Sequence, residues 1–369
     1  NTDPVDFAAE RAWLLLRMGE AQAARALVQN VDVEDYSPWM YQVAMQAALA
    51  TGDPAALCPI ADQGAALSSA PGWKLSRAMC AGLAGDGQRA TALIRDAGGG
   101  RTSDSIDLML ARKVIGMGAT NNGTVTIEWD DVDRLTPWRF GLAMASGETV
   151  PDRLLGAAPS AVRYWYALSP SPSPDKRIAA AELAAANGVF SSAGLLQLYA
   201  EAAASPDSGS AVQRSARVLA NAFTDDDWKS RVDAMRTLWT EPRGPRRQYG
   251  RLILTARAAA AVQPSEALLA DSDTILAAML STGYATRAQA WRPLLKRGSE
   301  GWAMAALADP AGRRMTDGDV SAYRAAVGDA KARLFYAGLA GLGLLSEADS
   351  ERMARALEVQ VGGVNSWTR

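Results

Sequence analysis

Apolar residues recur at fixed distances behind three glycines in the N-terminal part of the chain. Gly19, Gly52 and Gly85 stand 33 residues apart, and an acidic residue follows each of them. Small or aliphatic residues stand five, eight and nine positions after each glycine: Ala24, Leu27 and Val28, then Leu57, Ile60 and Ala61, then Ala90, Leu93 and Ile94. These offsets share one face of an α-helix. Glycine often ends a helix and an acid suits a first turn, so we predict a helix on each side of every glycine.

Proline marks the starts of further predicted helices. Trp39, Trp73 and Trp138 each stand one or two residues behind a proline. Proline is tolerated in a first turn because its missing N–H would have no partner there. We therefore predict a unit of about 33 residues, made of helix, Gly-acid turn, helix and proline-marked loop. The three tryptophans are expected to pack the joint between units. The alternative is a ligand-binding face, which needs exposed and convergent rings.

The same turn returns later with less regularity. Gly118 stands another 33 residues on, and Gly147 and Gly283 open further turns. Residues 121–127 predict a turn and a short extended segment in place of a second helix. Alanine-rich stretches such as 179–186 favour helix throughout. The predicted fold class is all-α, with helical hairpins that become irregular towards the C-terminus.

The chain resembles the tetratricopeptide repeat family through this 33-residue hairpin pattern. The match is good over residues 4–97, looser over 98–204 and weak over 205–369. It departs from the family where Val28, Ala61 and Ile94 replace a large aromatic residue of the second helix. The resemblance implies a curved α-solenoid of stacked antiparallel hairpins that share one continuous core and bind proteins or peptides. It assigns no binding residue in this chain.

Two proline- and serine-rich stretches divide the predicted array. Residues 169–174 read Ser-Pro-Ser-Pro-Ser-Pro, and residues 205–210 read Ser-Pro-Asp-Ser-Gly-Ser. Such stretches interrupt helices and connect segments. We predict a tetratricopeptide-like array over 1–168, a joint with an irregular repeat over 169–209, and C-terminal helical repeats or a bundle over 210–369. The alternative is an array up to residue 204 and a separate bundle after it.

Composition removes several function classes. The chain has no histidine among 369 residues, which excludes Ser-His-Asp and Cys-His catalysis and every histidine-ligated metal site. A net charge of -2 argues against a nucleic-acid partner. No apolar run reaches the roughly 20 residues that span a bilayer, so we expect no transmembrane segment. We also expect no cofactor, no metal and no catalytic residue.

The two cysteines stand on consecutive predicted helices. Cys58 lies early in the second helix of unit two and Cys80 in the first helix of unit three, at comparable heights on either side of one loop. A disulfide needs Cα atoms about 4.4–6.8 Å apart, which this arrangement allows. The alternative is two buried, reduced thiols. A disulfide would imply an oxidising compartment.

One stretch suggests a different class of protein. Residues 192–198 are similar to a Gly-Leu-Met-Gln stretch of lytic transglycosylases, some of which carry α-solenoids. That family needs an upstream catalytic Glu followed by Ser, whereas Glu182 is followed by Leu183. We interpret residues 192–198 as helix packing. The acidic run 225–227 predicts a helix cap with first-turn acids.

The sequence therefore favours a non-enzymatic scaffold that binds a partner protein or peptide. Arginine outnumbers lysine 32 to 6, which with the alanine content suggests a GC-rich bacterium. The cysteine pair and a first residue other than methionine favour the periplasmic side of the bacterial envelope. The alternatives are a carboxylate-dependent glycan-processing enzyme related to superhelical lytic transglycosylases, and a cytoplasmic tetratricopeptide-type adaptor.

Overall fold

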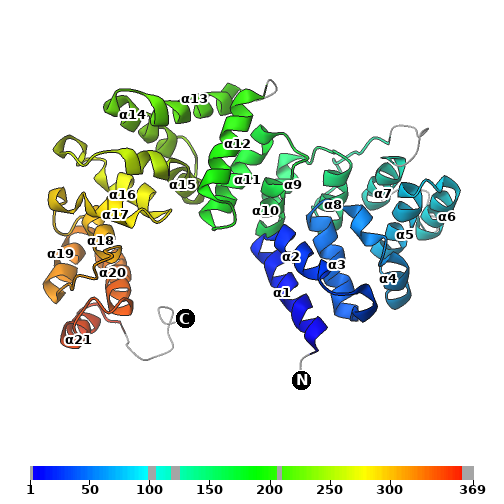
Figure 1. Ribbon diagram of the computed structural model, residues 1–369, viewed down its shortest axis with the longest axis horizontal. Helices are drawn as coiled ribbons and strands as arrows, with labels where there is room; N and C mark the ends of the chain where they lie inside the picture. Colours follow the sequence, from blue (N-terminus) through cyan, green and yellow to red (C-terminus); the bar gives the residue numbers. More distant parts are fainter. Residues whose placement is uncertain (1–2, 99–104, 118–124, 206–209, 360–369) are drawn as a thin grey trace. The chain divides into compact units, whose positions relative to one another are not determined.

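The computed structural model describes residues 3–98, 105–117, 125–205 and 210–359. They form twenty-one α-helices and four short 3-10 helices, with no β-strand among them (Figure 1). The all-α prediction is confirmed. Contacts divide the chain into unit 1, Asn1–Ser191, and unit 2, Ser192–Arg369. Each unit has a hydrophobic core of its own.

Unit 1 holds the first eleven α-helices and two 3-10 helices. They are α1 (Pro4–Met18), α2 (Ala21–Gln29), η1 (Val33–Asp35), α3 (Pro38–Ala50), η2 (Pro54–Leu57), α4 (Ala61–Leu67), α5 (Pro71–Leu83), α6 (Gly87–Gly98), α7 (Ile106–Met117), α8 (Pro137–Ala145), α9 (Asp152–Ala157), α10 (Ser160–Leu168) and α11 (Pro174–Ala186).

Unit 2 holds the remaining elements. They are α12 (Ser192–Ala204), α13 (Ser210–Thr224), α14 (Trp228–Thr240), α15 (Pro245–Ala261), η3 (Glu266–Leu268), α16 (Ser272–Leu280), α17 (Ala285–Gln289), η4 (Arg292–Leu294), α18 (Glu300–Leu307), α19 (Asp317–Val327), α20 (Asp329–Gly341) and α21 (Glu347–Ala356).

The repeat glycines share one backbone geometry. Gly19, Gly52, Gly85, Gly147 and Gly283 all have positive φ, between 65° and 96°. In each case the following residue donates its N–H to the carbonyl five positions before it, as Glu20 does to Leu15 at 2.8 Å and Tyr284 to Met279 at 3.1 Å. Only glycine adopts this conformation without strain, which explains its return at each turn. Gly118 lies outside the described residues.

Helix starts also follow the predicted chemistry. The side chain of Ser37 accepts a hydrogen bond from the N–H of Met40 at 3.2 Å, and Thr136 accepts one from Arg139 at 3.2 Å. A proline occupies the first turn of α3, α5 and α8. These caps satisfy N–H groups that have no partner inside the helix.

The second predicted helix of hairpin two is interrupted. We expected one helix through Cys58, but η2 ends at Leu57 and α4 begins at Ala61. Asp53 accepts a hydrogen bond from the N–H of Ala56 and turns the chain into a 3-10 helix. Cys58 therefore lies in a turn, and hairpin two is less regular than its repeat pattern predicts.

Most helices of unit 1 pack on near neighbours in the chain, and two contacts depart from this order. Helix α3 packs on α1 and α2, and its other main partner is α8, which in turn packs on α7, while α7 packs on α5 (Figure 1). Helix α10 returns to α1, where the indole N–H of Trp165 donates to the carbonyl of Leu16 at 3.2 Å. In a plain solenoid each repeat contacts only its neighbours in sequence.

A glycine permits the return of α8 onto α3. A Cβ added at Gly141 would lie 2.6 Å from the carbonyl oxygen of Leu49 and 2.7 Å from its Cα. Real Cβ atoms do not approach backbone so closely, so only glycine lets these two helices meet at this distance.

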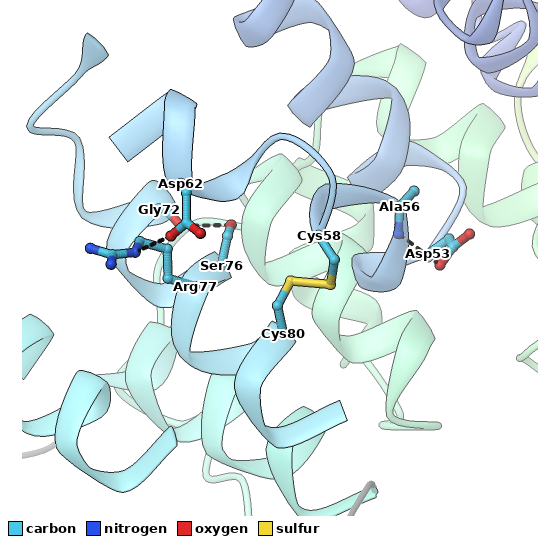
Figure 2. The surroundings of a disulfide bond; sticks show 8 residues. All are labelled: Asp53, Ala56, Cys58, Asp62, Gly72, Ser76, Arg77 and Cys80. Carbon is cyan, nitrogen blue, oxygen red and sulfur yellow. Dashed lines mark hydrogen bonds and ion pairs between the residues drawn. A yellow bond between two sulfur atoms is a disulfide. The ribbon is translucent and has the colours of Figure 1, made fainter. Parts of the chain in front are cut away.

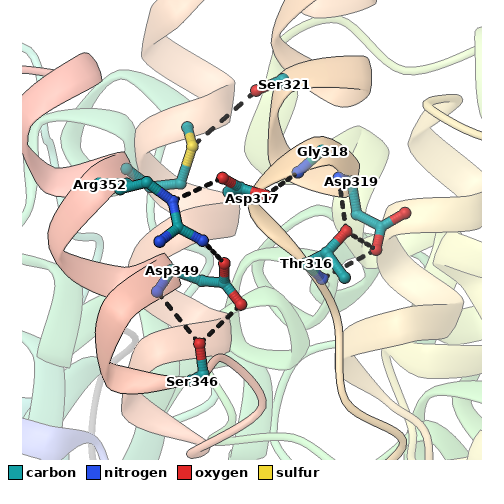
Figure 3. Close-up of polar contacts among 9 residues, drawn as sticks. Thr316, Asp317, Gly318, Asp319, Ser321, Ser346, Asp349 and Arg352 are labelled. Atoms are coloured by element: carbon teal, nitrogen blue, oxygen red, sulfur yellow. Dashed lines mark hydrogen bonds and ion pairs between the residues drawn. The ribbon is translucent and has the colours of Figure 1, made fainter.

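Unit 2 packs mainly between near neighbours along the chain. Helix α13 packs on α14, α15 on α16, α16 on α18, α18 on α20, and α19 on both α20 and α21. Figure 3 shows one such joint, where Nε of Arg352 on α21 donates to Asp317 at the start of α19 at 2.8 Å. The same guanidinium bonds Asp349, and a capping box of Thr316 and Asp319 starts α19.

Several ion pairs span about one repeat period. The paired residues stand 28 to 35 positions apart in sequence and join one helical hairpin to another. They include Arg25 with Asp53, Arg139 with Asp107, Arg236 with Asp271, and Arg352 with Asp317.

The predicted three-part division stays a prediction. Residues 169–173 connect α10 to α11, and these two helices pack together within unit 1. Pro174 already begins α11. The division between the two units falls after Ser191.

Candidate binding pocket in unit 1

An open pocket of about 260 Å³ lies between hairpins one and two. Its floor is an alanine face of α3, formed by Ala44, Ala47 and Ala48. These positions are three and four residues apart, so they share one side of the helix. Their side chains are methyl groups, and space remains above them where a larger residue would fill it.

Aliphatic side chains form the walls. Val28 lines the pocket from α2, Val31 and Val33 from the segment between α2 and α3, and Ile60 from the turn between η2 and α4. Ala56 and Pro59 complete the side that belongs to hairpin two. The interruption between η2 and α4 shapes this wall, because a continuous helix would run differently past α2.

Three polar side chains line the pocket: Arg25, Tyr36 and the exposed Gln29. The first two have protein partners. Arg25 pairs with Asp53 at 2.5 Å across the joint between the hairpins. The hydroxyl of Tyr36 donates to the carbonyl of Val28 at 3.1 Å. Burial, and then the neighbouring Tyr41, raise the pKa of Tyr36, so this hydroxyl keeps its proton at neutral pH. The pocket therefore presents apolar surface to a ligand.

Acidic residues flank Val33, one of the residues that line the pocket. Asp32, Glu34 and Asp35 surround Val33 on the segment between α2 and α3, and all three are exposed. The one charged residue that lines the pocket, Arg25, is already paired with a carboxylate. A cation that approaches this segment meets attractive potential.

Cys58 and Cys80 lie beside the pocket wall at disulfide distance. Their Cα atoms are 5.4 Å apart, and Figure 2 shows the sulfur atoms joined between the turn after η2 and the last turn of α5. Cys58 is exposed and follows directly after the η2 segment, one residue beyond Leu57. The bond therefore fixes the segment that supplies Ala56, Pro59 and Ile60 to the pocket.

The three predicted tryptophans lie at joints between helices. Trp73 is 0% exposed and packs against Tyr41, and a Cβ at Gly64 would come within 2.5 Å of its ring. A fully buried ring offers no surface for ligand stacking. Trp39 contacts Trp13 edge-to-face with centroids 5.7 Å apart. Trp138 lies next to Gly72 of α5, and both Trp39 and Trp138 are half-buried.

The two carboxylates considered in the sequence analysis, Glu182 and Asp227, lie on different helices. Glu182 lies in α11 and is 0% exposed. Asp227 caps α14, because it accepts hydrogen bonds from the N–H groups of Ser230 and Lys229 at 3.1 and 3.3 Å. These backbone bonds, Ser230 first, lower the pKa of Asp227. The predicted helix cap is confirmed at Asp227, but the prediction of first-turn acids is wrong, because α14 begins at Trp228, after the acidic run.

Two searches of the described ranges found nothing. No group of Cys, Asp and Glu side chains there is arranged to hold a metal ion. Every helix in that part of the chain is too short or too polar to cross a lipid bilayer.

Sequence reasoning missed the pocket. Its signal was present in residues 44–48 of α3, where alanine occupies three positions of one helix face. In the sequence, alanine-rich stretches predicted helix and nothing more. These alanines line a pocket only because the second helix of hairpin two is interrupted, and no local sequence pattern predicts that interruption.

Comparison with protein-family models, curated proteins and solved structures found no match to this chain. The tetratricopeptide-like resemblance therefore rests on the 33-residue pattern of the chain itself. What the structure establishes is an all-α protein whose helices pack in neighbouring pairs.

Proposed function

We propose that this chain is a non-enzymatic helical-repeat scaffold that binds a partner protein or peptide through unit 1. This proposal rests on the open apolar pocket at the joint of hairpins one and two. Repeat proteins use the surfaces between their stacked units to bind extended partners. The shared glycine turns and the period-spaced ion pairs support a tetratricopeptide-like, solenoid-type stack.

We place this scaffold on the periplasmic side of a bacterial envelope. The support is the cysteine pair at disulfide distance, since such bonds persist in oxidising compartments. The high ratio of arginine to lysine is the second support. Alkylation of intact cells with a thiol reagent tests the location, because an oxidised pair gains no mass and reduced cysteines gain two labels.

The glycan-processing alternative receives no support from the geometry of Glu182. That enzyme class needs two carboxylates converging in a cleft. Glu182 is fully buried in a helix and presents no carboxylate to a sugar.

A pull-down from native membranes and periplasm tests the scaffold function. The full chain serves as bait, and Ala56→Phe, which fills the pocket from its side, serves as the paired bait. We expect a stoichiometric protein that survives moderate salt on the wild type and is depleted on the variant. Recovery of a glycan or small molecule in the absence of any protein partner would overturn the proposal.

A further inference from the structure

We propose that the pocket of unit 1 takes one large apolar side chain from a partner segment whose flanking residues are lysine or arginine. The proposal rests on the scaffold function and specifies the chemistry of the partner. The anchor is an aliphatic or aromatic side chain, and the basic flanks lie along the acidic segment around Val33.

The size of the pocket fits a single side chain. Sites for drug-sized ligands and cofactors run from about 300 to 1,000 Å³. At about 260 Å³ the pocket lies below that range. An apolar cavity of about 150 Å³ is enough to hold benzene. The pocket therefore accepts a phenylalanine, leucine or methionine side chain and is too small for a nucleotide or a flavin.

The lining selects an apolar anchor. Val28, Val33 and Ile60 face the space, and the floor consists of alanine methyl groups. The hydroxyl of Tyr36 and the guanidinium of Arg25 both have partners already. Gln29, the remaining polar lining residue, is exposed. A polar anchor among the methyl and aliphatic groups would lose its water without gaining a hydrogen bond, which is costly.

The negative charge of the segment around Val33 favours basic residues on either side of the partner's anchor. Asp32, Glu34 and Asp35 are exposed and stand within two residues of Val33, which lines the pocket, so we take this segment as the acidic rim. A segment with lysine or arginine beside its anchor is attracted to this rim, and an acidic segment is repelled. Such complementarity acts mainly on specificity and on the rate of association, and it weakens as salt rises.

The cysteine bond keeps the pocket open before binding. It holds the turn after η2 on α5, so Ala56, Pro59 and Ile60 stay in place without a ligand (Figure 2). A site that is already formed avoids the entropy of ordering on binding.

Fluorescence anisotropy with labelled peptides and the full chain tests the proposal. The probe is a short peptide with one central phenylalanine flanked by lysines. One control peptide replaces phenylalanine with serine, and another replaces the lysines with glutamates. We expect the lysine-flanked phenylalanine peptide to bind most tightly, with an affinity that falls as salt rises.

Protein variants locate the binding. Ala56→Phe is expected to weaken the lysine-flanked probe about tenfold or more because the added ring occupies the anchor's space. Val33→Ser, at an exposed position of the wall, is expected to weaken it about fourfold and serves if Ala56→Phe folds poorly. Ala26→Leu adds an apolar residue on the exposed side of α2 and is expected to leave binding unchanged. Circular dichroism melts check that each variant is folded.

The outcomes separate this proposal from the scaffold function. No binding of the probe to wild type, or equal binding to wild type, Ala56→Phe and Val33→Ser, overturns the pocket assignment. Equal affinity for lysine- and glutamate-flanked peptides overturns the charge rule. If a partner is captured equally by wild type and Ala56→Phe, the scaffold function stands and the pocket is not its site.

Discussion

Unit 1 and unit 2 use the same helical building block but connect it differently. In unit 1, α8 returns to α3 and α10 returns to α1, across long stretches of intervening chain. In unit 2, the main helix contacts join elements that are near neighbours in sequence. The 33-residue pattern is clearest in unit 1, yet unit 1 departs further from sequential stacking. A strong local repeat therefore fixes the hairpin and its turn, and does not fix the order in which hairpins pack.

Both units use buried tryptophan, close glycine contacts and ion pairs between hairpins, and unit 1 adds a disulfide. Unit 1 uses a cysteine bond, buried tryptophan and a close backbone contact at Gly141. At the joint of α19 and α21, unit 2 uses a half-exposed ion pair between Arg352 and Asp317. Exposed ion pairs contribute little each, so we expect loss of the disulfide or of the Gly141 contact to cost more stability than loss of the Arg352–Asp317 pair.

Removal of the disulfide should give the largest difference in stability between unit 1 and unit 2. The Cys58→Ser, Cys80→Ser double variant opens a loop whose ends are 22 residues apart, and loop entropy predicts a loss of about 3 kcal/mol. Hydrogen exchange should accelerate in η2, α4 and α5 and stay unchanged in α14–α20. Equal exchange in oxidised and doubly substituted protein would show that the bond adds nothing to unit 1.

Gly141→Ala should give the next largest effect. The new Cβ meets the backbone of Leu49, and overpacking of this kind costs about 1–3 kcal/mol. Gly341→Ala at the end of α20 is the matched control, since nothing lies within 4 Å of a Cβ there. It should be neutral or slightly stabilising. Urea melts of both variants test the pair, and equal midpoints would contradict the close α3–α8 contact.

An acid-sensitive ion pair should give the smallest effect. The hydrogen bond from Arg352 lowers the pKa of Asp317 below its usual value. A lowered pKa in the folded state gives stability that is present above about pH 4, the unfolded value, and is lost as pH falls through the folded pKa. Asp317→Asn should remove this part of the acid dependence of α19 and α21, measured by hydrogen exchange against pH. An unchanged acid profile would show that the pair is not formed in solution.

The sequence predicted those features that depend on residues close together in the chain. The helices, the positive-φ turns at Gly19 and Gly52, and the proximity of Cys58 and Cys80 follow from local signals and from one short hairpin. The contact of Gly141 with Leu49 does not, because the two residues belong to hairpins whose local patterns are alike. Nothing in either pattern says which hairpin will cover which.

The pocket escaped prediction for a related reason. Repeat spacing predicts one helix through Leu57 and Ile60, and such a helix leaves no reason to expect a gap above Ala47 and Ala48. The cap made by Asp53 and the short η2 break that helix. Ala47 and Ala48 line a pocket only because this helix is interrupted.

The return of α8 onto α3 has a consequence for synthesis of the chain. Helix α3 leaves the ribosome long before α8, the helix that covers it, because residues 51–136 must be made in between. At about 5–20 residues per second, the face of α3 that α8 covers stays exposed for on the order of ten seconds. The interval between the synthesis of α1 and that of its partner α10 is longer still. The nascent N-terminal hairpins are thus the part of this chain on which a ribosome-bound chaperone has the most time to act.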